Sequence, residues 1–127
     1  MKSKKVEVAS GYKENEILNA KPEELTLMLY DGIIRFIKQA KIFNEDKKIE
    51  KTNNAIVRAQ NIITELRSTL DMDYEISKEL DPLYEFMNRR LLEANIKKDN
   101  AMMDEVLDLA AELRDTWKEA MKIAKKV

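Results

Sequence analysis

The sequence contains no cysteine and no histidine. Without cysteine there is no disulfide framework, no thiol nucleophile and no cysteine-based zinc site. Without histidine the chain lacks the commonest general base and metal ligand, and with it the Glu-x-x-His pattern by which ferritin-like bundles bind iron. We therefore expect no enzyme activity and no cofactor.

Glycine and proline are also scarce, at two residues each in 127, while Lys, Glu, Leu, Ile and Ala are common. Such a composition, with almost no alternation of apolar and polar residues, is typical of an all-helical protein with short connections. The length fits one domain with its own core. We predict a single helical-bundle domain over residues 1–127, with an N-terminal arm at 1–21 and the bundle at 22–127.

Charge of either sign is not in excess, because 23 basic residues nearly balance 24 acidic ones. No basic field exists to hold nucleic acid or anionic lipid. No apolar run approaches the length of a membrane span, and the first ten residues lack the apolar core of a signal peptide. The expected protein is cytoplasmic, with no membrane insertion and no nucleic-acid partner.

The stretch from Pro22 to Phe43 predicts the first helix and is apolar on more than one side. Its ordinary core face is followed by a second row on a different side, so the apolar arc covers roughly 260° at about 100° per residue. The second row consists of Leu27, Tyr30, Ile34 and Ile37. We expect this helix to carry more apolar surface than a four-helix bundle consumes, and hence a docking face.

Apolar stripes with the helical period predict further helices at about 49–70, from about 76 to 94, and from about 100 to 124. Pro82 either lies within the third helix or marks its true start with Asp81 as cap. The stripe of the fourth helix runs through Trp117, Ala120 and Ala124. Short turns between the helices predict an antiparallel up-down four-helix bundle.

The arm at residues 1–21 has mixed charge and little periodicity, with Tyr12, Ile17 and Leu18 as its apolar members. These residues form either a local cluster packed on the domain or a displaceable, partly ordered strap. Arg89 and Arg90, near Glu93, form either a local ion-pair network or hydrogen-bond donors to the carbonyls of a bound peptide.

Four segments resemble the FliS family of flagellin-specific export chaperones. They are PEELTLMLYDG at 22–32, RAQNIITELRSTLDMD at 58–73, RRLLEAN at 89–95 and LRDTW at 113–117. Tyr12 occupies the place of that family's N-terminal tyrosine. The resemblance covers residues 12–117 in unbroken order.

The resemblance implies a cytoplasmic chaperone that binds the disordered C-terminal segment of flagellin, prevents its premature polymerisation and engages a component of the flagellar export gate. It also implies that the N-terminal strap covers part of the flagellin groove in the free protein. Together with the second apolar row, it predicts flagellin-binding residues on the arm, the first helix and the third helix. These are Tyr12, Ile17, Leu18, Leu27, Tyr30, Ile34, Ile37, Phe86, Arg89, Arg90 and Asn95.

The alternative hypothesis is a structural or adaptor bundle that self-associates through the extra apolar face of the first helix. A weak homodimer is also compatible with the chaperone hypothesis.

Overall fold

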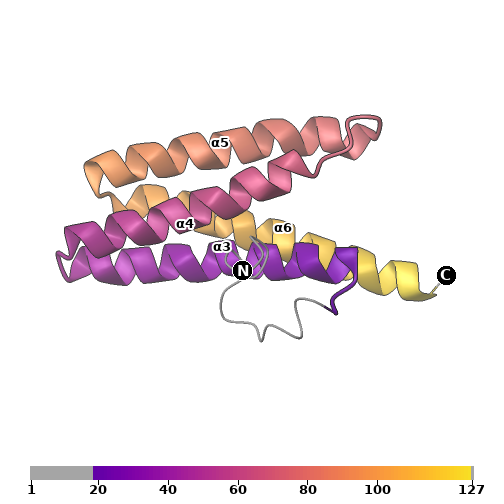
Figure 1. Ribbon diagram of the computed structural model, residues 1–127, viewed down its shortest axis with the longest axis horizontal. Coiled ribbons are helices and arrows are strands. Elements are labelled where there is room, and N and C mark those ends of the chain that lie inside the picture. The colour runs from indigo at the N-terminus through magenta and orange to yellow at the C-terminus, as the bar shows by residue number, and fades with distance from the viewer. Residues whose placement is uncertain (1–18, 127) are drawn as a thin grey trace.

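The structure is a computed structural model that describes residues 19–126, and in that range it contains four helices. They are α3 (Pro22–Glu45), α4 (Ile49–Ser68), α5 (Glu75–Lys97) and α6 (Asn100–Lys126). α3 packs against α4 and α6, and α5 packs against the same two helices. Figure 1 shows that sequence neighbours run antiparallel. The predicted all-α antiparallel bundle is confirmed, whereas the predicted strap, with Tyr12, Ile17 and Leu18, lies outside the described residues.

All four described helices contribute to one apolar core, as their apolar stripes predict. Ile33 and Ile37 of α3 are completely buried, and so are Ile56, Ile62 and Ile63 of α4, Met87 and Leu91 of α5, and Met103 and Val106 of α6. The described helices therefore share one continuous apolar core.

The wide apolar arc of α3 is mostly buried in this structure. In its second row, Tyr30, Ile34 and Ile37 are at most 6% exposed, and Leu27 is half-buried. The expectation of a large open face on this helix is therefore wrong. The physical reason is that α3 contacts two neighbouring helices, α4 and α6, so its apolar surface is covered on more sides than one stripe would require.

The helix α5 begins at Glu75 and continues through Pro82, so Pro82 does not mark its start. Asp81 does not cap the helix. Its carboxylate instead accepts a hydrogen bond of 2.6 Å from Nε of Arg67, which joins α5 to the last turn of α4. Since a proline lacks an N–H, it removes one intrahelical hydrogen bond here without ending the helix.

Carboxylates accept hydrogen bonds at the N-terminal ends of α3 and α6. The Glu24 carboxylate accepts a hydrogen bond from the backbone N–H of Lys21 at 3.4 Å, which is one half of a capping box. The other half is missing because a lysine side chain has no acceptor for the backbone N–H of Glu24. The Asp99 carboxylate accepts the N–H groups of Ala101 and Met102 at 2.8 and 3.2 Å, as expected of an N-cap.

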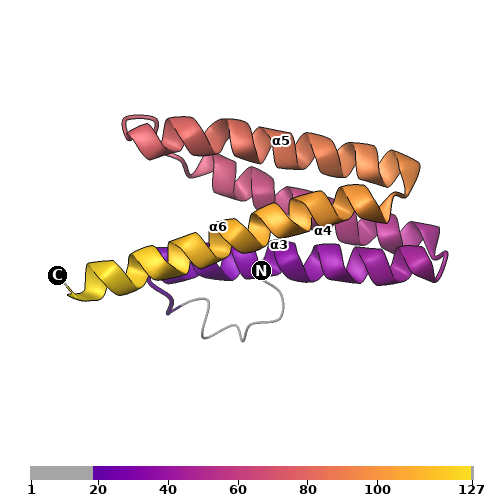
Figure 2. The ribbon, with the colours of Figure 1, turned by 180° about the vertical axis from the view of Figure 1, so that it is seen from behind.

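The bundle opens toward one end. Figures 1 and 2 show that α3 and α6 stay together while α4 and α5 diverge from them toward the N-terminus of α3. At the same end, α6 continues past the first turn of α3. We call this region, where α3 begins, α4 ends, α5 begins and α6 ends, the open end of the bundle.

Candidate functional site

The sequence-predicted residues of α3 lie in the core or at its edge. Tyr30, Ile34 and Ile37 belong to the core cluster, and Leu27 is half-buried. Tyr30 also lines a pocket, described below. Their predicted contact with flagellin stays a prediction.

Two of the predicted residues of α5, Phe86 and Arg89, contact each other on the surface of that helix. Arg89 is exposed, pairs with Glu85 at 3.2 Å and lies over the half-buried ring of Phe86, with 5.7 Å from its guanidinium carbon to the ring centroid. This places a cation against an aromatic face, a favourable arrangement. The Arg89 side chain therefore contacts Glu85 and Phe86 on the surface of α5.

Arg90 and Asn95 are engaged in contacts between helices. Arg90 donates to both carboxylate oxygens of Glu105 on α6, at 2.6 and 3.0 Å, and to Glu93 at 3.2 Å. The hydrogen bond from Arg90 lowers the pKa of the Glu105 carboxyl. Asn95 donates to the side-chain oxygen of Asn53 on α4 at 2.7 Å. For Arg90 the structure therefore shows the ion-pair network rather than a free donor.

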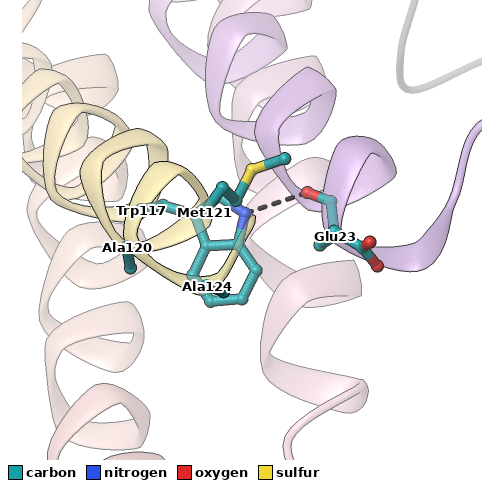
Figure 3. A pocket seen from close by; sticks show the side chains of 5 residues that line it. All are labelled: Glu23, Trp117, Ala120, Met121 and Ala124. Carbon is teal, nitrogen blue, oxygen red and sulfur yellow. Dashed lines mark hydrogen bonds between the residues drawn. The ribbon is translucent and has the colours of Figure 1, made fainter. Parts of the chain in front are cut away.

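Among the described residues of the open end, three neighbouring pockets lie around the beginning of α3, and a fourth, of about 380 Å³, lies between the end of α4 and α5. The central pocket, of about 220 Å³, lies between all four described helices and the turn after α4. The side pocket, of about 250 Å³, lies between the first turns of α3 and the end of α4. The rim pocket, of about 460 Å³, lies against the last turns of α6 (Figure 3).

Shared residues connect the three pockets. Thr26 and Thr69 line both the central and the side pocket, and Trp117 lines both the central and the rim pocket. The rim pocket is otherwise formed by Glu23, Ala120, Met121 and Ala124. The hollows therefore follow one another around the beginning of α3, and their walls are mainly apolar, as in most binding sites for apolar side chains.

Trp117 holds the wall between the central and rim pockets. Its indole N–H donates to the carbonyl oxygen of Glu23 at 2.9 Å (Figure 3). The apolar stripe of the fourth helix runs through Trp117, and the residue is half-buried and packed against the core cluster. Ala120 and Ala124, one and two turns further along the same stripe, are exposed because α6 extends past the start of α3.

Two buried tyrosines line the central pocket. The hydroxyl oxygens of Tyr30 and Tyr84 lie 2.5 Å apart, and either one is able to donate to the other. The side chains are 3% and 2% exposed. Burial raises the pKa of both hydroxyl groups, and for Tyr84 the hydrogen bond with Tyr30 raises the pKa further. Both groups therefore stay protonated at neutral pH.

The described residues carry no arrangement that suggests catalysis. Among them, no group of three or more acidic side chains is placed to hold a metal ion. The lowered pKa of the Glu105 carboxyl is the opposite of what a general acid needs. None of the described helices is long and apolar enough to span a membrane. Fold and pockets together define a helical-bundle protein with mainly apolar pockets at one end, a surface suited to binding.

Comparison with known proteins identifies the particular class. Residues 5–124 match the family model described as "Flagellar protein FliS". The chain is 41% identical over 117 residues to the flagellar secretion chaperone FliS of Bacillus subtilis (strain 168), covering 92% of this chain and 88% of that protein. It is 33% identical to FliS of Escherichia coli (strain K12), covering 85% of this chain and 82% of that protein. The chain belongs to the FliS family.

A solved structure confirms the fold. The "Crystal structure of flagellar chaperone from bacteria" superimposes with a TM-score of 0.75 at 17% sequence identity, covering 86% of this chain and 90% of that one. The resemblance stated from the sequence motifs is thus confirmed, and so is the expectation of a chaperone-class protein rather than an enzyme.

Proposed function

We propose that this protein is a cytoplasmic flagellar secretion chaperone that binds the C-terminal segment of flagellin, prevents its premature polymerisation and aids its delivery to the export apparatus. The observation that carries the proposal is the identity of 41% to a flagellar secretion chaperone over 92% of this chain. The apolar hollows at the open end supply the kind of surface that such binding needs.

Flagellin's C-terminal segment is expected to be disordered before it binds and to fold on the chaperone. Ordering a segment on binding costs roughly 2 to 5 kcal/mol or more, so the contact must be large and mainly apolar. The open end fits this demand because three mainly apolar hollows follow one another around α3. We place the anchoring contacts of flagellin in these hollows.

Of the binding residues predicted on α3, Tyr30 keeps a direct role in this proposal because it lines the central pocket. Ile34 and Ile37 act by holding α3 in place, since their side chains are buried. Leu27 is half-buried and remains available at the edge of the helix. The outer face of α5, with Arg89 and the exposed Leu92, is proposed as additional contact surface.

Two further partners were expected. We propose that the loaded chaperone engages a component of the flagellar export gate, which the family resemblance implies. Self-association through the second apolar row of α3 is a weaker candidate, because Tyr30, Ile34 and Ile37 are buried and a homodimer formed through them would require the bundle to open.

The proposal is tested by comparing full-length flagellin with flagellin truncated at its C-terminus. Both are titrated into the purified protein, and sedimentation at several protein concentrations controls for self-association. Tight binding of full-length flagellin with loss of binding on truncation is expected. Equal binding of both flagellins would refute the proposed mode, and a stable dimer indifferent to flagellin would favour the adaptor hypothesis.

A further inference from the structure

The hydroxyl pair of Tyr30 and Tyr84 has one donor too many. Each hydroxyl carries one proton, and the single contact between their oxygens uses one of the two, whichever residue donates. Neither hydroxyl makes another hydrogen bond to the described residues. One O–H group is therefore left over in a place where both side chains are almost fully buried. An unused donor in such a place is costly unless something accepts it.

The unused donor lies at the central pocket, which both tyrosines line. The pocket has a volume of about 220 Å³. An apolar cavity of about 150 Å³ is enough to hold a benzene molecule, so there is room here for an entering side chain the size of leucine or phenylalanine. Leu66, Ile76 and Leu80 contribute apolar wall. The pocket thus offers an apolar space with the unused tyrosine donor in its wall, beside the hydroxyls of Tyr74 and Ser77.

The charges around the pocket indicate what kind of oxygen accepts this donor. No lysine or arginine is among the described residues that line it, and Asp71 is. A carboxylate entering the pocket would lose its water without gaining a cation and would be repelled by Asp71. A neutral acceptor has neither penalty. Main-chain carbonyls without an intrahelical partner occur at helix C-terminal ends, beside apolar side chains.

We infer that the Tyr30–Tyr84 pair is a recognition element that donates one hydrogen bond to a main-chain carbonyl of the bound flagellin segment, whose adjacent apolar side chain fills the central pocket. This inference rests on the proposed function and makes it more specific. The pair fixes the position of one residue of the segment, while the surrounding apolar contacts supply most of the affinity.

The test uses the full chain and a synthetic peptide of the flagellin C-terminus. In the double variant Tyr30→Phe/Tyr84→Phe both hydroxyls are removed and the packing volume is kept, so no buried polar group is left unpaired and folding is preserved. We expect peptide binding to weaken about threefold to tenfold, the range of one hydrogen bond. Each single variant keeps one hydroxyl able to donate, and is expected to bind within about twofold of wild type.

Tyr74→Phe is the matched control. Tyr74 also lines the central pocket, but its side chain is 64% exposed and its hydroxyl is not part of the pair. Its removal is expected to leave binding unchanged. If the wild type binds the peptide and the double variant binds equally tightly, the inference is wrong while the proposed function stands. If the wild type does not bind, the proposed function itself fails.

A second measurement identifies the acceptor. Peptides in which one amide at a time is replaced by an ester carry a weaker carbonyl acceptor at that position. One position is expected to weaken binding to the wild type and to have no further effect on the double variant, as a double-mutant cycle requires for a direct contact. If every ester has the same effect on both proteins, the spare proton is bonded to pocket water and the inference is contradicted.

Discussion

Trp117 in α6 and Glu23 in the first turn of α3 are 94 positions apart in the chain and are joined by a hydrogen bond of 2.9 Å. The contact ties the last turns of α6 to the beginning of α3 and places the indole ring between the central and rim pockets. Residues from opposite ends of the described chain therefore build the open end together.

Trp117 is the only tryptophan of the sequence, so its fluorescence reports on the open end alone. We predict that saturation with the flagellin C-terminal peptide shifts its emission to shorter wavelength, because the peptide removes water from a half-buried indole. The measurement is an emission spectrum with and without peptide. Binding detected by another method with an unchanged spectrum would place flagellin away from the open end.

Ala120→Asp is predicted to weaken flagellin binding at least about tenfold, because an unpaired carboxylate would be buried when the rim pocket is filled. Ala120 is exposed in the free protein, so folding should be little affected. Titration with the peptide gives the affinity, and thermal unfolding checks the fold. The matched control is Ala101→Asp, at an exposed alanine near the other end of α6. Similar loss in both variants would argue against the rim pocket.

Ile37→Ala is predicted to lower the free energy of unfolding by about 2 to 5 kcal/mol, as expected for a large-to-small change at a fully buried position. Ile42→Ala is the control on the same helix, at a side chain that is 58% exposed, and should change stability by less than about 0.5 kcal/mol. Urea denaturation measures both. Nearly equal effects would contradict the assignment of Ile37 to the core.

The ion pair between Arg90 and Glu105 predicts acid sensitivity with a defined sign. The pKa of the Glu105 carboxyl is lower in the folded state than in the unfolded state. The ion pair therefore contributes fully to the free energy of unfolding above the ordinary carboxyl pKa of about 4.3, and this contribution is lost as the pH falls through the folded-state pKa. Glu105→Gln should therefore flatten the loss of stability below that pH. Glu112→Gln, at an exposed carboxylate of the same helix, should not. Unfolding curves across the acid range compare them.

The fold could be predicted from the sequence because apolar residues recur with the helical period in four stretches separated by short polar turns. Pro82 was the open question in that prediction. Pro82 lies within α5, and Asp81, a candidate N-cap in the sequence, instead accepts a hydrogen bond from Arg67. A single sequence does not show such a competition between local and tertiary partners.

The candidate site was less predictable. Periodicity identified the second apolar row of α3, but whether Ile34 faces a partner or the core depends on how closely α4 and α6 pack, which the pattern does not encode. Similarly, the stripe through Trp117 and Ala120 is continuous in sequence, and only the relative lengths and offsets of α3 and α6 leave its last turns uncovered. Tyr30 and Tyr84 lie on two different helices, so no pattern in the sequence around either residue predicts that they form a pair.

The most direct test of the account is isothermal titration of the full chain with the C-terminal peptide of its own organism's flagellin at several temperatures. A one-to-one transition with a large negative heat-capacity change is predicted, because a disordered segment would fold while burying apolar surface in the hollows of the open end. Absence of heat at every temperature, in a sample shown to be folded and helical, would contradict the proposal that this bundle binds flagellin.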